Sequence, residues 1–480
     1  MHTLIKKKDT SIAISPEKGI KKIANNEKTF KQILYILFLF YAVAILYGVI
    51  NHEPWRDEAQ AWLLARDTSL AQLLKIIPAE GHPPLWYFLL MPFAKLGMPY
   101  QSLNWLTAFI IIGAVYLLLF KTKLHPIIKL LLPFSYFLFF EYSLIGRNYC
   151  LIIFFVAAIL SLYPKRFEYP LFALSVIGLF NSHVLAFSLA FTFAIIYSAD
   201  AYQNKKKSLS VIGGIILMFA GGLYLVPYMA MSPIATAFKP EATEHVTQIA
   251  NAIKGGILLD GDTTVAMILF IALGVLLITR TKAFILLQGG IAGTLYILAY
   301  RYNLVSLRHQ GMLFVILLAA YGIAPFYEND IFNIVKVKFG TFRYGTWIFI
   351  FIMLWQLQYS FASYNADRVQ RFSGAKDAAA YIIDHHLQDS IIVGYQAWAA
   401  SAILPYLKND KRFYYAECQR YGSYYINDSC LLNKRWSNPP EYAVNVAFNN
   451  FKDSLGKVIF VLNIPLRTSE MKYMELFISI

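Results

Sequence analysis

Seven polar residues, spread along a mostly apolar chain, have side chains that could act together on one substrate. The set comprises three carboxylates, two arginines and two histidines: Asp57, Glu58, Glu141, Arg147, Arg308, His82 and His309. A carboxylate can take the proton of a hydroxyl group as that group attacks an electrophile. Arginine can donate two parallel hydrogen bonds to a phosphate. These residue types could therefore supply a base and anion-binding groups to one site.

The chain that carries these residues has the composition of a membrane protein. Of its 480 residues, 58% are hydrophobic and 15% are charged, whereas roughly 25% are charged in soluble proteins. Apolar runs such as 33–50 and 265–278 approach or reach the roughly 17 to 25 residues that cross a bilayer as a helix. The net charge of +15 is explained by basic cytoplasmic loops, so we expect a lipid bilayer and no nucleic acid as partner.

Hydropathy predicts an α-helical domain over residues 32–362. The run 84–96 is too short to cross and contains Pro92, so we expect it to lie at the membrane edge. The remaining apolar runs predict about 11 transmembrane helices, at 33–50, 103–120, 127–140, 149–163, 171–180, 184–199, 209–229, 264–279, 283–300, 312–327 and 345–361.

The distribution of basic residues predicts which side of the membrane each loop occupies. Residues 1–31 contain eight lysines and three acids, which indicates a cytoplasmic tail before a retained first span. With 11 spans, the later basic clusters fall on the same side as this tail. We therefore expect a multi-pass protein of the plasma (inner) membrane, with all seven polar residues at the opposite, outer face.

Residues 363–480 are less apolar and predict a small extracytoplasmic α/β domain. Helices are expected at 373–387 and 397–407, and strands at 390–394 and 412–416. Cys418 and Cys430 lie in this domain, where they could pair in an oxidising compartment or remain free thiols.

The first outer loop, residues 51–97, is expected to form two short amphipathic helices at the membrane surface. One follows Pro54, and Ser69 with Gln72 fits a capping box that opens the other. Asp57 and Glu58 begin the first helix. Carboxylates there could simply favour the positive end of the helix dipole, but the other polar residues expected at this face indicate a site.

The pair Asp57-Glu58 after the first span, the interfacial helices and the closing His82-Pro83-Pro84-Leu85 resemble the first outer loop of GT-C fold glycosyltransferases. The relevant branch includes protein O-mannosyltransferases, the lipid A aminoarabinose transferase and rhizobial core galacturonosyltransferase-like proteins. The resemblance covers residues 31 to about 150, and more loosely Arg308-His309-Gln310-Gly311. It implies a GT-C type fold and a hexosyl- or pentosyltransferase. Such an enzyme moves a sugar from a polyprenyl-phosphate-linked donor to a glycan, lipid or protein acceptor of the cell envelope.

The resemblance also implies roles for the seven residues. Asp57 is the expected base, and Glu58 positions either it or the acceptor. Glu141 stands where the family commonly has a second acid, usually aspartate. The groups expected to contact substrate phosphate are Arg147, Arg308, His309 and His82.

Other interpretations of these residues stay open. Arg147 could be a snorkelling residue, and Arg308 with His309 a helix-start anchor. His82 could instead bind a divalent metal with Glu58, although two ligands are weak evidence and we predict no obligatory cofactor. The alternative function is a transporter or flippase of a lipid-linked glycan, but the chain shows no repeated halves. A catalytically inactive binding protein is a third.

Overall fold

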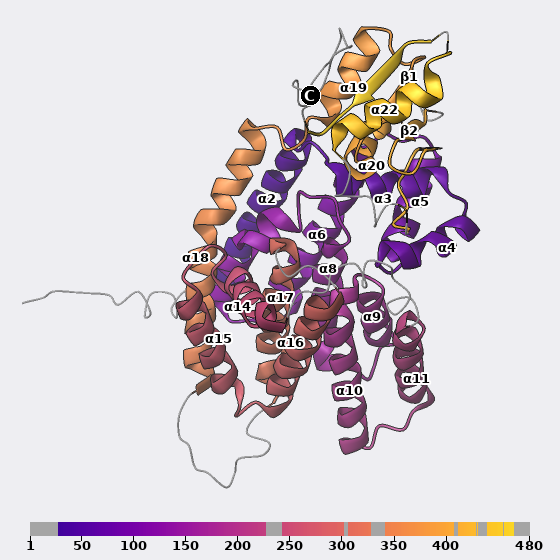
Figure 1. The fold of residues 1–480 in the computed structure, drawn as a ribbon. Helices are drawn as coiled ribbons and strands as arrows, with labels where there is room; N and C mark the ends of the chain where they lie inside the picture. Colours follow the sequence, from indigo (N-terminus) through magenta and orange to yellow (C-terminus); the bar gives the residue numbers. More distant parts are fainter. Residues whose placement is uncertain are drawn as a thin grey trace, which may run out of the picture.

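The computed structural model describes residues 27–226, 242–301, 306–327, 341–407, 411–428, 430, 439–454 and 456–464. Most of the predicted cytoplasmic tail lies outside these residues. The described chain forms a helical bundle with a small sheet domain at one end (Figure 1). Within these ranges, five helices are long and apolar enough to cross a membrane: Glu27–Asn51, Ser102–Lys121, Val184–Gln203, Thr281–Leu298 and Leu307–Phe326. The protein is thus a helical chain with candidate membrane spans, and the figure of 11 stays a prediction.

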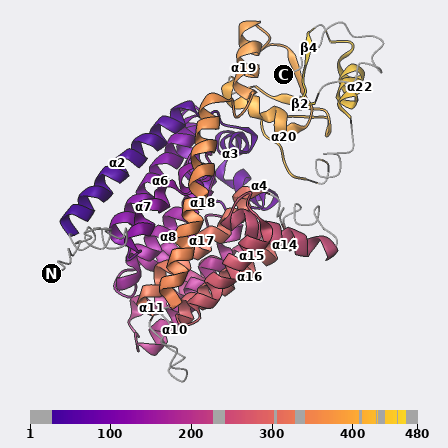
Figure 2. The same ribbon diagram turned by 90° about the vertical axis from the view of Figure 1, so that its left-hand side faces the viewer.

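Nearly every predicted span contains a helix of the bundle. The bundle helices are α2 (Glu27–Asn51), α6 (Ser102–Lys121), α8 (Tyr149–Leu162), α9 (Leu171–Phe180), α10 (Phe187–Gln203), α11 (Leu209–Leu223), α15 (Thr263–Leu277), α16 (Thr281–Arg301), α17 (Leu307–Ile323) and α18 (Thr341–Val369). Helix α18 runs along the bundle and leads into the sheet domain (Figure 2). One further amphipathic helix, α14 (Ala242–Ile257), was not predicted.

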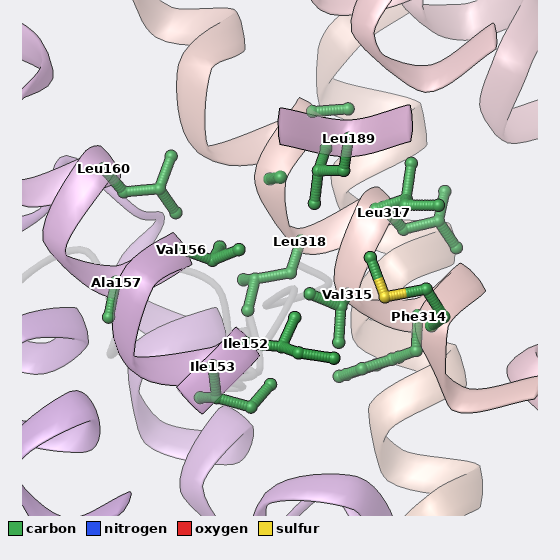
Figure 3. Packing of buried hydrophobic residues seen from close by; sticks show 14 of the residues in the cluster. Ile152, Ile153, Val156, Ala157, Leu160, Leu189, Phe314, Val315, Leu317 and Leu318 are labelled. Atoms are coloured by element: carbon green, nitrogen blue, oxygen red, sulfur yellow. The ribbon is translucent and has the colours of Figure 1, made fainter. Parts of the chain in front are cut away.

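The bundle is held at its centre by α17, whose residues 310–323 are all buried. A helix that is apolar all round has this position in a large bundle. Leu318 of α17 lies beside Ile152 and Val156 of α8 (Figure 3). A Cβ on Gly322 would come within 2.7 Å of the Leu160 side chain, so glycine permits the two helices to approach closely. Close approach through small residues stabilises helix pairs in lipid.

The predicted span 127–140 is divided into three pieces in the structure. Helix α7 (Pro126–Leu131) passes into the 3-10 turn η1 (Leu132–Phe134), and the π-helix η2 (Phe137–Glu141) follows. Pro133 ends the α-helix because it lacks an N–H donor and its ring clashes with the preceding turn. Single π-turns are frequent at functional sites, and this one ends at Glu141.

The first outer loop contains the two helices expected there, together with the expected membrane-edge helix. These are α3 (Arg56–Asp67), α4 (Leu70–Glu80) and α5 (Leu85–Lys95). The capping box of α4 is present, since Gln72 N donates to Ser69 Oγ at 3.2 Å and Ser69 N donates to Gln72 Oε1 at 2.8 Å. The three helices lie between the bundle and the sheet domain (Figures 1 and 2).

The carboxy-terminal sheet domain contains the helices α19 (Ala375–Asp384), α20 (Ala397–Ala400), η6 (Ser401–Tyr406) and α22 (Pro440–Phe451) and the strands β1 (Ile391–Gly394), β2 (Phe413–Tyr415), β3 (Arg420–Gly422) and β4 (Val458–Val461). Strand order is β3-β2-β1-β4. Strand β1 is parallel to both neighbours, with Val393 opposite Tyr414 and Phe460, whereas β3 is antiparallel to β2. A disulfide joins Cys418 to Cys430. Of the two alternatives left open for these cysteines, the structure has the disulfide and not the free thiols.

Candidate functional site

The structure brings Asp57 together with two arginines that are far from it in the sequence. Asp57 lies in the first turn of α3, Arg147 in the turn before α8, and Arg308 in the first turn of α17. Arg147 Nη1 and Arg308 Nη2 each lie 2.9 Å from Asp57 Oδ2. All three side chains are mostly buried, with 13–20% of their surface exposed. One carboxylate oxygen is therefore held between two cations.

The arginines determine the charge of Asp57. Burial alone would raise the pKa of this carboxyl, but Arg147, Arg308 and Arg56 outweigh it and lower the pKa to about 2. A carboxylate with so low a pKa is a weak base. In this state Asp57 stays ionised and paired with the two guanidinium groups.

Glu58 is turned away from Asp57 and is completely buried. Its Oε1 accepts hydrogen bonds from Asn104 Nδ2 at 2.7 Å and from Gly146 N at 2.6 Å. Its Oε2 accepts from Trp55 N at 2.9 Å and is 3.3 Å from His52 Nε2. These hydrogen bonds tie the start of α3 to the turn that carries Arg147. Both roles expected for Glu58, positioning Asp57 or positioning the acceptor, stay predictions.

Gly146 is needed where Glu58 meets this turn. A Cβ at this residue would lie 1.9 Å from Leu103 Cδ2 and 2.8 Å from Glu58 Oε1. Real Cβ atoms do not come so close to other atoms, so a larger residue would force Leu103, Glu58 or the turn itself to shift. Glycine thus allows the close contact between this turn and Glu58.

A buried histidine, which the sequence did not single out, extends this network to α18. His52 Nδ1 lies 2.9 Å from Asp367 Oδ1, and His52 Nε2 faces Glu58. Burial alone would lower the pKa of His52, but Glu58 and Asp367 raise it to about 10. The protonated imidazole thus joins the ends of α2 and α18 to the start of α3.

We expect the protein to lose stability as the pH rises through about 10. The folded pKa of His52 exceeds its ordinary 6.5, so its contribution is complete below pH 6.5 and is lost as the folded form deprotonates. In detergent micelles, thermal unfolding should show a Tm that falls between pH 6.5 and pH 10. His52→Ala should be destabilised by ~3–5 kcal/mol at pH 6.5. The control His385→Ala, at an exposed position, should match wild type; an unchanged His52→Ala would contradict the assignment.

Three histidines lie beside the arginines. The His82 ring is 4.7 Å from the His183 ring, and His183 is 6.2 Å from His309. Arg147 Nη2 is 3.5 Å from His82 Nε2. Burial holds the pKa of both His82 and His183 well below the ordinary value; Arg147 reinforces this effect at His82, and His82 reinforces it at His183. These two rings are therefore neutral.

Two tyrosines support Arg308 and the histidines. Tyr142 stacks on Tyr149 with centroids 4.9 Å apart, and Tyr149 stacks on His183 at 4.6 Å. Tyr142 Oη donates a 2.6 Å hydrogen bond to the backbone oxygen of Arg308. The stack thus connects α8 to the first turn of α17 and holds Arg308 toward Asp57.

Glu141 lies at the other side of the arginines. Its Oε2 accepts a hydrogen bond from Tyr136 Oη at 3.0 Å. Burial raises its pKa, and Arg308 and Arg147 oppose this rise. Glu141 therefore belongs to the same electrostatic group as Asp57, and all seven predicted residues gather at one end of the bundle.

Glu80 is a further acid near the site that the sequence analysis missed, although it stands two residues before His82. Gln60 Nε2 donates to Glu80 Oε1 at 3.1 Å and to the backbone oxygen of Tyr425 at 2.8 Å. Asn427 Nδ2 also approaches Glu80 Oε1, at 3.5 Å. Burial is the main cause that raises the pKa of Glu80 to about 7. Glu80 thus titrates near neutrality where the carboxy-terminal domain meets the outer loop.

Glu80→Gln is expected to stabilise the protein above neutral pH. The folded pKa of Glu80 is raised from 4.5 to about 7, so its contribution to stability is complete below pH 4.5 and is lost as pH rises through 7. A neutral amide of the same size avoids this loss. Chemical unfolding in detergent at pH 8 should show a gain of ~2–3 kcal/mol over wild type, and no gain at pH 4. Glu168→Gln, at an exposed position, is the control; equal stability of Glu80→Gln and wild type at pH 8 would contradict the raised pKa.

A cavity of about 340 Å³ opens on the side of the site that faces the carboxy-terminal domain. Its lining includes Arg56, Phe372, Ile403 and Asn463. The Arg56 guanidinium lies 3.9 Å from the ring centre of Trp398, so α3 and α20 meet at its wall.

The structure does not support the alternative in which His82 and Glu58 together bind a divalent metal. Both Glu58 oxygens already face two partners each, so Glu58 is not free to share an ion with His82. Among the described residues, the one cluster of metal-binding types is Cys418, Asp428 and Cys430, and its two cysteines are joined in a disulfide. The residues at the Asp57 site therefore do not fit a metal held by Glu58 and His82.

Comparison of the chain with protein-family models, curated proteins and solved structures finds no match.

Proposed function

We propose that the protein is a membrane glycosyltransferase of the GT-C type. It moves a sugar from a polyprenyl-phosphate-linked donor to an envelope acceptor at the outer face of the membrane. The observation that carries this proposal is the contact of Arg147 and Arg308 with one oxygen of Asp57. This contact places a candidate base, Asp57, within hydrogen-bond distance of two candidate phosphate-binding groups.

In the proposed reaction, an acceptor hydroxyl attacks the anomeric carbon of the donor. The bond between that carbon and the phosphate oxygen breaks, and the phosphate leaves on its lipid with the electron pair. Asp57 accepts the hydroxyl proton. Arg147 and Arg308 stabilise the charge that grows on the leaving phosphate, which is where fixed cations contribute most.

Asp57 is a weak base while both arginines hold it, and donor binding removes this restriction. The donor phosphate competes with Asp57 for the guanidinium groups. Once the phosphate neutralises them, the cause of the low pKa of Asp57 is removed and its basicity rises. The acceptor is therefore deprotonated efficiently only when the donor is present.

The disulfide between Cys418 and Cys430 supports the proposed sidedness. Stable disulfides form in oxidising compartments and are rare in the cytoplasm. The carboxy-terminal domain contacts the outer loop through Gln60 and Tyr425, so the loop and its site share the compartment of this domain.

The test is mass spectrometry of membrane lipids and envelope glycans from cells with the protein, without it, and with Asp57→Asn. We expect one sugar to disappear from a glycan, lipid or protein, and its polyprenyl-phosphate donor to accumulate, in both altered strains. A deletion that traps an intact lipid-linked glycan in the inner leaflet, with Asp57→Asn like wild type, would instead identify a transporter and overturn the proposal.

A further inference from the structure

A second cavity, of about 410 Å³, lies beside the Asp57 site between α14, α17, α18 and η2. This volume falls within the roughly 300–1,000 Å³ of small-molecule sites. Six of its ten lining residues carry a side-chain amide or hydroxyl: Gln248, Asn251, Gln310, Tyr136, Tyr359 and Ser363. Such groups both donate and accept hydrogen bonds, which is what a ligand with many hydroxyl groups requires.

The lining has one residue of each charge. Lys254 and Asp260 both line the cavity, and Lys254 Nζ lies 4.0 Å from Asp260 Oδ1. Their formal charges sum to zero, so the lining has no excess charge to balance that of a sugar with a carboxylate or an ammonium group. The lining therefore favours an uncharged ligand.

Two contacts connect the cavity to the proposed reaction site. Tyr136 lines it and donates to Glu141 at 3.0 Å. Leu307 and Gln310, one helical turn apart on α17, also line it, and Arg308 belongs to the same turn of α17. The cavity and Arg308 are thus positioned by the same helix start.

A pair of glycines allows α14 to form the wall of this cavity. A Cβ on Gly256 would lie 2.6 Å from the Gln310 backbone oxygen, and one on Gly255 would overlap the Gln310 side-chain amide. Only glycine lets α14 lie this close to the first turns of α17. The close approach places the amides of Gln248 and Asn251 opposite Gln310.

We propose that this cavity binds an uncharged, hydroxyl-rich glycosyl group. This inference rests on the proposed function and makes the transferred or receiving sugar a neutral one, rather than an amino sugar or a uronic acid. The amides and hydroxyls bind its hydroxyl groups, and the rings of Tyr136 and Tyr359 offer flat apolar surface for its C–H face. The group belongs to the donor or to the acceptor, and the binding test separates these sources.

The test measures equilibrium binding to the full-length protein in lipid nanodiscs. The probes are undecaprenyl phosphate, the same carrier bearing mannose, the same carrier bearing 4-amino-4-deoxyarabinose, and octyl mannoside as an acceptor analogue. The variant is Gln248→Leu with Asn251→Leu, which removes two amides without a large change in size. Thr247→Val, an exposed position on the same helix that is not in the lining, is the control.

Wild type and Thr247→Val should bind the mannose-bearing carrier about tenfold or more tightly than the bare carrier or the amino-sugar carrier. The double variant should lose this preference but keep its affinity for the bare carrier, which shows that it is folded. If octyl mannoside binds but the mannose-bearing carrier is not preferred, and if the double variant no longer binds octyl mannoside, the neutral sugar belongs to the acceptor. Equal binding of all carriers, with no octyl mannoside binding, overturns the inference and leaves the phosphate site standing. Failure of wild type to bind any carrier overturns the proposed function itself.

Discussion

Replacing Asp57 with asparagine is expected to lower the rate of sugar transfer by about 10²–10⁴-fold, the usual contribution of a general base. The amide cannot accept the proton of the acceptor hydroxyl. It also no longer competes for Arg147 and Arg308, which each contact the Asp57 carboxylate at 2.9 Å. The variant should therefore bind undecaprenyl phosphate at least as tightly as wild type. Turnover by purified protein and carrier affinity in nanodiscs give the two measurements.

The matched control for this change is Asp67→Asn. Asp67 ends the same helix and pairs with Arg66 at 2.8 Å, so this variant also removes a carboxylate from a buried ion pair of α3. It should keep its turnover. Near-normal turnover by Asp57→Asn would remove Asp57 as the base, and weaker carrier binding would show that Asp57 does not compete with phosphate.

Arg308→Ala is expected to reduce transfer by about 10²–10³-fold, as does the loss of one donor to a developing oxyanion. Because Arg308 is proposed to contact the donor phosphate, KM for the donor should rise while KM for the acceptor stays within about twofold. Arg308→Lys should recover only part of the activity, since an ammonium cannot make the bidentate contact. Steady-state kinetics with each substrate varied in turn provide the measurement.

Arg420→Ala is the control for this second change, because Arg420 pairs with Asp428 at 2.6 Å within the carboxy-terminal domain. This variant should retain both KM values. An equal loss for donor and acceptor in Arg308→Ala, with the fold intact, would argue against phosphate contact. It would favour instead the interpretation that Arg308 anchors the start of its helix.

Much of the architecture could be predicted because its signals are local. The capping box of Ser69 and Gln72 lies at the start of helix α4, which it specifies. The alternation of helical and strand segments over residues 373–416 is likewise visible within each segment. The division of 127–140 was less visible. Pro133 gave a local reason for a break, but a π-turn at Glu141 depends on how α17 and α18 pack against it.

The site was harder to predict because its members differ in partners rather than in residue type. Asp57 and Glu58 are adjacent carboxylates, yet one meets two arginines and the other meets backbone N–H groups and an asparagine. Glu58 differs because it contacts Asn104, 46 positions later in the chain, and Gly146, 88 positions later. Glu80 was missed for the same reason, since its pKa reflects burial by a domain that begins some 280 residues later.

The contact of Gln60 with Tyr425 joins positions 365 residues apart, and this separation has a consequence for biosynthesis. A ribosome completes the helices around Asp57 long before it adds the segment that covers α3. On the proposed sidedness, that segment must also cross the membrane and form its disulfide. A nascent chain thus holds an incomplete site while it is still being inserted. If the proposed function and sidedness hold, sugar transfer would begin only after the last quarter of the polypeptide has reached the outer compartment.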